Sequence, residues 1–343
     1  MRVGVVVRRL STDGGTERFT LGLVRHLVEA GDAVTAYTLE PGERPPGVAV
    51  RRLPGPPVRG RVPRMLAVAW GSARVPRAGL DRLVGMVRAP GFDVWRAGGG
   101  CHADWLHAAQ RNISAAERID LHLDRQAART AGRIVVNSAL GGAGLRTHYG
   151  VTPDRIELVR NGVDLDRFRP VARARGRAIV FVGNGWRRKG LSTAISAIAS
   201  LPGARLDVWG SEPRPRRWYA EVARLGLGDR VAFRGRCPDP AAALPGYDAL
   251  VLPTRYDPLA NVCLEALACG VPVVTSARNG AAEVLPEAAW VVADPADAPA
   301  FAAALERALQ WPEAPSVARA VAEGHPAVGA FDRLRSLLVE PVA

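Results

Sequence analysis

The stretch YDPLANVCLEALACGVPVVTSARNGAAEVL, residues 256–285, contains the most specific pattern in this chain of 343 residues. An apolar helix is expected over residues 262–269, and a β-branched strand over residues 272–275 follows it directly. Short buried strands that alternate with helices are typical of a parallel sheet with helices on both faces. The stretch therefore predicts an α/β fold.

Two acidic residues flank the start of this helix. The helix is expected to begin near Leu259, Ala260 and Asn261, and the N–H groups and dipole of a helix N-terminus favour a bound phosphate. Asp257 precedes the helix, where its carboxylate could accept hydrogen bonds from sugar hydroxyls. Glu265 lies two turns inside and could hold a ribose diol. Taken alone, the two acids also fit a plain helix cap and an ordinary helix residue.

The upstream segment FVGNGWRRKGLSTAISAIASLP, residues 181–202, has a similar organisation. A strand ends in a turn that contains Gly183 and Asn184, and the basic residues Arg188 and Lys189 precede a helix. Cations at this position could hold a diphosphate and stabilise a leaving group, although a solvated loop would have the same composition. Lys189 is the only lysine in a chain that otherwise uses arginine, which favours the functional interpretation.

The N-terminus predicts a Rossmann-like opening. A strand is expected over residues 3–7, then the pair Gly14 and Gly15, then an amphipathic helix that ends at Gly31. Such glycines either let a donor phosphate approach the backbone or form an ordinary tight turn. The glycine motifs of nicotinamide-dependent dehydrogenases and of P-loop enzymes are both absent from the sequence, which argues against these two classes.

The segment RAGGGCHADWL, residues 96–106, places three glycines after an expected strand. Glycines at a strand end leave room for a ligand. His102 is expected to project into a cleft near the reacting centre, although a lone histidine is also commonly a structural residue.

Two series of alternating strands and helices predict two Rossmann-like domains that face a central cleft. We expect an acceptor-side domain over residues 1–168 and a donor domain over residues 169–325. Residues 326–343 are expected to form a helix that packs back toward the first domain. The Pro-, Gly- and Arg-rich residues 41–64 are expected to be irregular.

These motifs resemble family 4 glycosyltransferases, whose hallmark is an acidic residue, seven residues and a glutamate, followed by A-x-x-x-G-x-P-V. The corresponding residues here are Asp257, Glu265, Ala266, Gly270, Pro272 and Val273. The family usually has glutamate at the first position, so Asp257 is a departure. The family's spacing of glycine, lysine and glycine is matched by Gly183, Lys189 and Gly190, while Asn184 replaces its usual arginine. The D-P-x-x-N-V and N-G-x-x-E variants resemble the lipopolysaccharide core glucosyltransferase branch.

The resemblance implies a GT-B fold and retaining transfer of a hexose from a nucleotide diphosphate sugar, with a UDP-sugar favoured, to a glycan or glycolipid. It implies same-face attack by the acceptor hydroxyl, with the departing phosphate taking its proton. The implied catalytic residues are Asp257, Arg188, Lys189 and His102. The implied donor contacts are Gly14, Gly15, Gly183, Asn184, Leu259, Ala260, Asn261 and Glu265. No Asp-x-Asp metal motif occurs at a strand end, so neither a metal nor another cofactor is expected.

The chain is strongly basic, with a formal net charge of +13. Between Arg44 and Arg96 there are 11 arginines and only two acids. These are either solvated loop arginines or a surface that faces an anionic acceptor or an anionic membrane. Aromatic residues do not interleave with the arginines, which disfavours nucleic acid. The short, interrupted apolar runs predict a cytoplasmic protein that can bind peripherally to the inner face of the plasma membrane.

Two other functions remain open at this point. A sugar-nucleotide 2-epimerase of the same layout would act on the donor without an acceptor. A non-catalytic sugar-nucleotide-binding protein would bind the donor without turnover, and the aspartate at position 257 keeps this alternative open.

Overall fold

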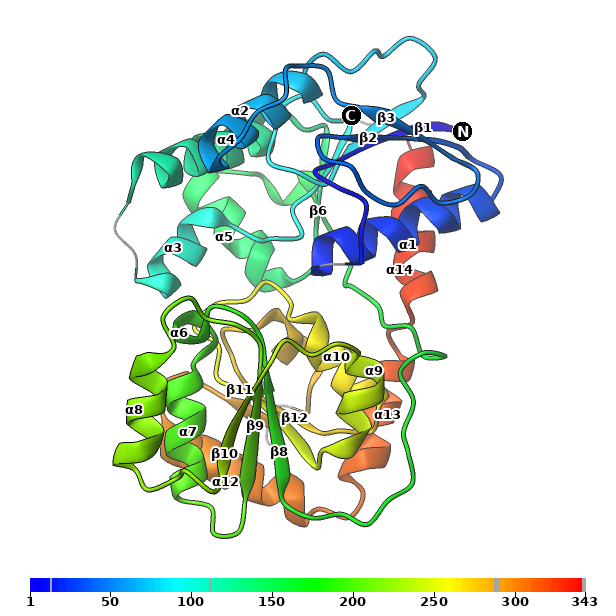
Figure 1. Cartoon of the computed structure of the whole chain (residues 1–343). Helices are drawn as coiled ribbons and strands as arrows, with labels where there is room; N and C mark the ends of the chain where they lie inside the picture. The colour runs from blue at the N-terminus through cyan, green and yellow to red at the C-terminus, as the bar shows by residue number, and fades with distance from the viewer. Residues whose placement is uncertain (13, 111–112, 287–289, 341–343) are drawn as a thin grey trace. The chain divides into compact units, whose positions relative to one another are not determined.

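The computed structural model describes residues 1–12, 14–110, 113–286 and 290–340. It divides into two compact units, drawn with their elements labelled in Figure 1. Unit 1 comprises Met1–Asn161 and the C-terminal residues from Val328 on, and unit 2 comprises Gly162–Ala327. Each unit contains one parallel sheet with helices on both faces, as the alternating pattern of the sequence predicts.

Unit 1 contains a seven-stranded sheet in the order β3-β2-β1-β4-β5-β6-β7, in which all pairs are parallel. The strands are β1 (Arg2–Val7), β2 (Ala33–Thr38), β3 (Val48–Arg52), β4 (Arg82–Gly85), β5 (Val94–Arg96), β6 (Arg133–Val136) and β7 (Ile156–Leu158). The chain extends the sheet from β1 in one direction through β2 and β3, and from β4 in the other. The neighbours β1 and β4 therefore form the switch point, where open parallel sheets bind ligands.

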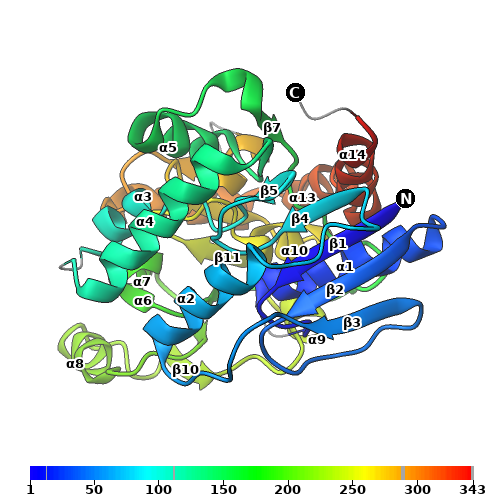
Figure 2. The same ribbon diagram turned by 90° about the horizontal axis from the view of Figure 1, so that it is seen from above.

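The helices of unit 1 cover both faces of its sheet. One core contains Leu23 of α1 (Gly15–Glu29) and Leu334 of α14 (Ala327–Val339) together with Val5 of β1. The other contains residues of α2 (Arg61–Ser72), α4 (Ala115–Thr130) and α5 (Ala139–Tyr149) together with Val6 of β1. Neighbouring residues of β1 thus face opposite cores, as strand geometry requires. Figure 2 shows α2 and α4 side by side.

Unit 2 contains a six-stranded parallel sheet in the order β10-β9-β8-β11-β12-β13. The strands are β8 (Ala178–Val182), β9 (Arg205–Trp209), β10 (Val231–Gly235), β11 (Ala249–Leu252), β12 (Val273–Ser276) and β13 (Val291–Val292). Its switch point lies between β8 and β11, which are direct neighbours. The loops that follow these two strands contain the basic pair and the acidic residue singled out in the sequence.

The helices of unit 2 pack in pairs, α7 with α12 and α10 with α13, on the two sides of the sheet (Figure 1). They are α6 (Trp186–Lys189), α7 (Leu191–Ala199), α8 (Arg216–Arg224), α9 (Pro240–Ala243), α10 (Asn261–Ala268), α12 (Ala298–Gln310) and α13 (Ala314–Glu323). Unit 1 also contains α3 (His102–Ala109). None of the described helices has the length and apolar character needed to cross a membrane.

The expectation that residues 41–64 are irregular is wrong. Strand β3 lies inside this range and α2 begins at Arg61. The strand is an edge strand with exposed arginines, and the proline and glycine residues around it concealed its short apolar alternation.

The units also divide at Asn161 and Gly162, earlier than the expected boundary at residue 168. Val163 pairs with Pro326, which ties the start of unit 2 to its end.

Candidate functional site

In unit 2, the loop after β8 carries the basic pair. Gly183 follows the strand, and a Cβ at this position would lie 3.3 Å from Cε of Lys189, so the missing side chain leaves room for the lysine. Gly190 has a φ of 79°, and a Cβ there would overlap the carbonyl oxygen of Pro253 at the end of β11. Glycine is therefore needed at position 190 both for its backbone conformation and for the close approach of the two loops.

The loop after β11 places Asp257 against both cations. Its Oδ2 accepts a hydrogen bond from Nζ of Lys189 at 2.5 Å and one from Arg188 at 3.1 Å. Arg188 also donates to the carbonyl oxygen of Tyr256 at 2.6 Å. The three charged residues singled out in the sequence thus meet at the switch point of the sheet. The pairing of Asp257 with the two cations depends on β8 and β11 being neighbours in the sheet. The sequence does not reveal that these strands are neighbours.

The electrostatics of this cluster keep the Asp257 carboxylate ionised. Burial raises the pKa of Asp257, but Lys189 and Arg188 more than offset this effect, and the pKa lies below its ordinary value. Lys189 and Asp257 are both buried, with exposed fractions of 8%. Two cations share one carboxylate, so the cluster has a net positive charge and can bind an anion such as a diphosphate.

Helix α10 begins beside this cluster, with Ala260 as its N-cap and Asn261 as its first residue. Leu259 and Ala260 are buried. The amide oxygen of Asn279 accepts hydrogen bonds from the N–H groups of Ala260 and Ala281, both at 3.2 Å. Asn279 therefore fixes the loop that leads into the helix. In the sequence Asn279 stands out only as the first residue of the N-G-x-x-E motif, and it was not among the predicted site residues.

The two other polar donor residues expected in unit 2 are Glu265 and Asn184. Glu265 is buried in the second turn of α10, with an exposed fraction of 8%. The amide oxygen of Asn184 accepts a hydrogen bond from the backbone N–H of Ser211 at 2.8 Å, which ties the turn after β8 to the loop after β9. Asn184 is itself exposed.

In unit 1, Gly14 caps the start of α1 with a φ of 93°, and Gly15 is the first helical residue. The carboxylate of Glu17 lies over this turn, since Oε2 is 2.7 Å from the position that a Cβ on Gly14 would take. Arg8 bonds to the same carboxylate at 3.1 Å. An anion that approaches the glycine turn would therefore compete with Glu17 for Arg8.

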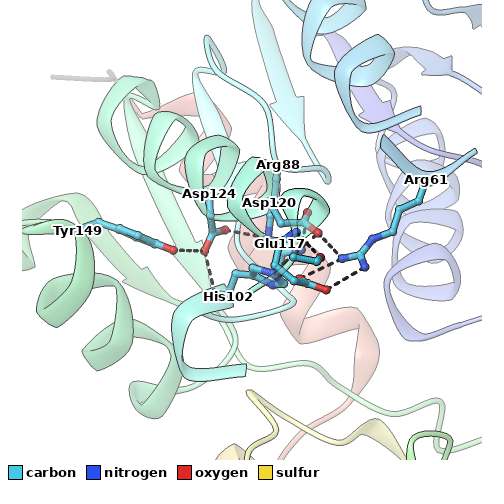
Figure 3. A network of polar contacts seen from close by, with 8 residues as sticks. Arg61, Arg88, His102, Glu117, Asp120, Asp124 and Tyr149 are labelled. Carbon is cyan, nitrogen blue, oxygen red and sulfur yellow. Dashed lines mark hydrogen bonds and ion pairs between the residues drawn. The ribbon is translucent and has the colours of Figure 1, made fainter. Parts of the chain in front are cut away.

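His102 belongs to a buried network of charged residues in unit 1 (Figure 3). Its Nε2 lies 2.7 Å from Glu117, and its ring stacks on Trp105 with the centroids 5.3 Å apart. Arg61 binds Glu117 through two hydrogen bonds of 2.9 and 3.1 Å and also binds Asp120 at 2.6 Å. The expectation that His102 projects into a cleft is wrong, because the side chain is only 5% exposed and is held by groups from α4.

The protonation of this network follows from its contacts. Burial raises the pKa of Glu117, but Arg61 and His102 outweigh this effect, and the pKa is lowered. Burial and Arg88 lower the pKa of His102 although Glu117 acts in the opposite direction. The imidazole is therefore neutral at neutral pH, and Nε2 carries the proton that it donates to Glu117. The histidine acts on its neighbours as a positioning residue.

A third carboxylate completes the network. Asp124 is fully buried and accepts hydrogen bonds from Arg88 at 2.8 Å, from the backbone of His102 at 2.8 Å and from the hydroxyl of Tyr149 at 2.9 Å. Glu117, Asp120 and Asp124 occupy one face of α4, because they are three and four residues apart. This acidic face was not predicted from the sequence, because its partners come from α2, from α3, from the loop after β4 and from the end of α5.

The positive charge of the arginines between Arg44 and Arg96 is neutralised by acids more fully than the local sequence implies. Several form ion pairs with acids outside the segment or at its end: Arg61 with Glu117 and Asp120, Arg64 with Glu40, Arg77 with Asp93, and Arg88 with Asp124. A count over the segment alone therefore overstates the charge of the folded surface. The remaining charge is concentrated on exposed residues such as Arg51, Arg52 and Arg59.

Two groups of side chains in unit 1 have metal-ligating atoms close together. They are His102, Glu117 and Asp120, and Cys101, Asp104 and His148. In the first group the guanidinium of Arg61 already binds both carboxylates. In the second group His148 bonds to Asp104 at 2.9 Å. In each group, hydrogen bonds between side chains explain why these atoms lie close together.

Comparison with known proteins assigns the two units to known families. Residues 13–167 match the family described as Glycosyltransferase Family 4, and residues 176–310 match Glycosyl transferases group 1. The chain therefore combines two α/β domains of a glycosyltransferase with the GT-B fold. It contains a domain of each of these glycosyltransferase families and is a glycosyltransferase.

Similar curated proteins include the D-inositol 3-phosphate glycosyltransferase 1 of Catenulispora acidiphila, which is 29% identical over 78% of this chain and 75% of the relative. The lipopolysaccharide glucosyltransferase WaaG of Escherichia coli (strain K12) is 26% identical over 82% of each chain. The crystal structure of WaaG superposes with a TM-score of 0.81 and 22% identity, and covers 99% of this chain and all of the other. HepE of Anabaena, solved with UDP and glucose, gives a TM-score of 0.76 at 16% identity and covers 99% of this chain and all of the other.

Proposed function

We propose that this glycosyltransferase moves a hexose, with retention, from a UDP-sugar to a glycan or glycolipid acceptor with an anionic group. The observation that carries the proposal is the meeting of Arg188, Lys189 and Asp257 beside the start of α10. Two cations and a helix N-terminus can neutralise a departing diphosphate, and such electrostatic stabilisation is usually the largest contribution to catalysis.

Each residue of the cluster has a role in this proposal. Arg188 and Lys189 bind the diphosphate, and Asp257 holds them side by side. Both cations bond to Oδ2 of Asp257, and no described residue bonds to Oδ1, which can accept a hydrogen bond from a hydroxyl of the sugar. The acceptor hydroxyl then attacks the face that the leaving group departs from, and the departing phosphate takes its proton.

The comparisons support both substrate classes. HepE of similar fold was solved with UDP and glucose, which supports a UDP-sugar as the donor. One relative is named for lipopolysaccharide and another for D-inositol 3-phosphate, and the second of these names specifies a phosphorylated acceptor. A lipopolysaccharide core or another cell-surface glycan is the acceptor class that we favour.

The proposal is tested with purified full-length protein. UDP-, GDP- and ADP-sugars are screened by thermal shift, and donor hydrolysis and transfer to glycan acceptors are then measured. We expect UDP-sugars to stabilise the protein and to be consumed faster when an acceptor is present. Epimerised donor, or binding without any turnover, would contradict the proposal.

Replacing Glu265 with glutamine is expected to raise the donor KM about tenfold while the thermal stability stays close to that of the wild type. The reason is that a carboxylate can accept both hydrogen bonds of a ribose diol, whereas an amide loses a charge-assisted bond. The affinity for free UDP is measured by calorimetry. Glu306→Gln, a change of the same type in a surface ion pair of the same unit, serves as the control. Unchanged UDP affinity in the first variant would exclude the ribose role.

Chelation is expected to leave transfer unchanged, because Arg188, Lys189 and the N-terminus of α10 supply the positive charge that a divalent ion supplies elsewhere. Rates are compared with and without EDTA, and again after addition of manganese. Loss of activity in EDTA with recovery in manganese would show that a metal takes part.

Helix α2 supports binding to an anionic membrane. Its Leu66 and Trp70 are 49% and 45% exposed, one helical turn apart on the same side, and Arg74 lies over the Trp70 ring at 3.9 Å. Apolar and aromatic side chains beside arginines are typical of helices that bind at a lipid surface. This side of α2 is opposite the side that contains Arg61, which binds Glu117, and Val68, which packs in the core of unit 1.

The double variant Leu66→Ser and Trp70→Ser is expected to weaken binding to liposomes of anionic lipid about tenfold, since partial burial of two apolar side chains is lost. Cosedimentation measures the effect. Tyr219→Ser removes a side chain that is 47% exposed on unit 2 and should bind like the wild type. Equal binding by all three proteins would locate the membrane contact elsewhere or rule it out.

A further inference from the structure

Unit 1 contains a buried arginine without a counter-charge. Arg96 ends β5 and is 4% exposed, yet no carboxylate among the described residues bonds to it. Its guanidinium donates to the amide oxygen of Asn161 and lies over the Phe19 ring at 3.6 Å, while Nε has no hydrogen-bond partner. The other buried charges of unit 1, such as Asp124 and Glu117, are paired with arginines.

The missing counter-charge is costly. An unpaired buried ion is strongly disfavoured, and native proteins keep such a group mainly where a ligand or partner supplies the opposite charge. Burial lowers the pKa of Arg96 to about 9. Neither the pairing with neutral Asn161 nor the contact with Phe19 brings a full negative charge, so both leave the guanidinium able to bind an anion.

A small pocket lies at this guanidinium. Its volume is about 130 Å³, and it is lined by Arg96, by the glycines 98–100 that follow β5, by Arg88 after β4 and by Thr16 in the first turn of α1. The glycines bring backbone into the pocket without side chains, and the N-terminus of α1 contributes the positive end of its dipole. The pocket thus combines a helix N-terminus with a buried cation that has no counter-charge, at the switch point of the sheet.

The size and the surroundings of the pocket limit its ligand. A volume of about 130 Å³ suits a phosphate or carboxylate group but is below the range of about 300–1,000 Å³ typical of whole ligands. A larger pocket of about 340 Å³ shares Val87 and Arg88 with it. The larger pocket presents three further arginines and Asp120 beside an apolar wall that includes Met65 and Val68. This lining offers hydrogen-bond donors, an acceptor and apolar surface, and it therefore fits a sugar or polyol.

We propose that the Arg96 pocket binds a phosphate or carboxylate group of the sugar substrate, and that the adjoining pocket holds the sugar or polyol that carries this group. The proposal rests on the glycosyltransferase function, because it assigns the anion to the acceptor. The diphosphate of the donor has the same chemistry and is the other possible source of the anion, so the experiment has one arm for each.

The substitution Arg96→Met tests the site through a signature that a structural arginine would not give. Since the change leaves no carboxylate unpaired, we expect the variant to be at least as thermostable as the wild type in chloride buffer. Inorganic phosphate should raise the Tm of the wild type by mass action and should lose this effect in Arg96→Met. Arg96→Lys, which keeps the charge, should retain part of it.

Arg74→Met provides the matched control. Arg74 also lies over an aromatic ring of unit 1, at 3.9 Å, but it is exposed and lines neither pocket. This variant should respond to phosphate like the wild type. An equal response to phosphate in Arg96→Met and in the wild type would overturn the proposal, as would no response of the wild type at millimolar phosphate.

The source of the anion is identified by calorimetry with two probes, glucose 6-phosphate and UDP. Loss of glucose 6-phosphate binding in Arg96→Met, with UDP binding unchanged, supports the acceptor assignment. Loss of UDP binding alone would overturn that assignment and give the pocket to the donor. Failure of the glycosyltransferase proposal would look different, because wild-type protein would then transfer no sugar to an acceptor, whatever its response to phosphate.

A second variant covers the case in which Arg96→Met does not fold. Thr16→Met narrows the small pocket and leaves Arg96 in place, and Thr16 is only partly buried. We expect this variant to fold, as judged by circular dichroism, and to bind glucose 6-phosphate at least several-fold more weakly than the wild type. Unchanged affinity in a folded Thr16→Met variant would also contradict the proposal.

Discussion

Replacing Lys189 with alanine is expected to lower the rate of transfer about 10- to 100-fold, because one charge-assisted bond to the leaving diphosphate is worth about 1.5–3 kcal/mol. The donor affinity should fall as well. Lys189 is buried and bonds to Asp257 at 2.5 Å, so its loss also leaves that carboxylate with Arg188 alone. A lower Tm is therefore expected together with the lower rate.

The effect of Lys189→Ala on catalysis is separated from its effect on stability by a control variant at the neighbouring Arg187 and by measurements at saturating donor. Arg187 lies on the same turn but is exposed, and Arg187→Ala should transfer at nearly the wild-type rate. Rates are measured well below the Tm of each variant and at saturating donor. Wild-type kinetics in Lys189→Ala would remove the basic pair from the mechanism, whereas a low Tm with a normal rate would make Lys189 a structural residue.

The segments that carry Arg188, Lys189 and Asp257 could be predicted from the sequence because their signals are local. A glycine turn after a strand, a basic pair before a helix, and the start of α10 are each encoded within a few residues. What the sequence could not supply was the pairing of Lys189 with Asp257 across 68 positions. That contact depends on β8 and β11 being neighbours, which is a property of the crossover and not of either segment.

Unit 1 was harder to predict because its important contacts connect distant segments. Strand β3 is short and exposed at the edge of the sheet, and its arginines conceal the strand pattern. His102 looked like a cleft residue because it follows three glycines, but its environment is set by Glu117, fifteen positions away. Arg96 looked like one arginine among many, and only its burial without a carboxylate distinguishes it.

Arg61 illustrates the same difficulty in energetic terms. In the sequence it belongs to an arginine-rich loop that could be fully solvated. In the structure it is the first residue of α2 and binds two carboxylates of α4, Glu117 and Asp120. Glu117 is almost completely buried, with an exposed fraction of 1%, so its charge depends on Arg61 and on the proton donated by His102.

The substitution Arg61→Gln is therefore expected to destabilise the protein by about 2 kcal/mol, less than the loss for a fully buried pair because the guanidinium is half exposed. For a domain of this size the Tm should fall by about 4–8 °C. Arg25→Gln breaks an ion pair of the same unit in which both side chains are exposed, and it should shift the Tm by less than about 2 °C. Thermal unfolding is monitored by circular dichroism.

A double-mutant cycle shows whether the effect arises from the buried carboxylate. Glu117→Gln removes the charge that Arg61 compensates and keeps an acceptor for His102. If the cost of Arg61→Gln comes from leaving Glu117 unpaired, the double variant should lose clearly less stability than the sum of the two single variants. Additive losses would mean that Arg61 and Glu117 act independently. The network of α4 would then not be the reason why this arginine-rich segment has a fixed structure.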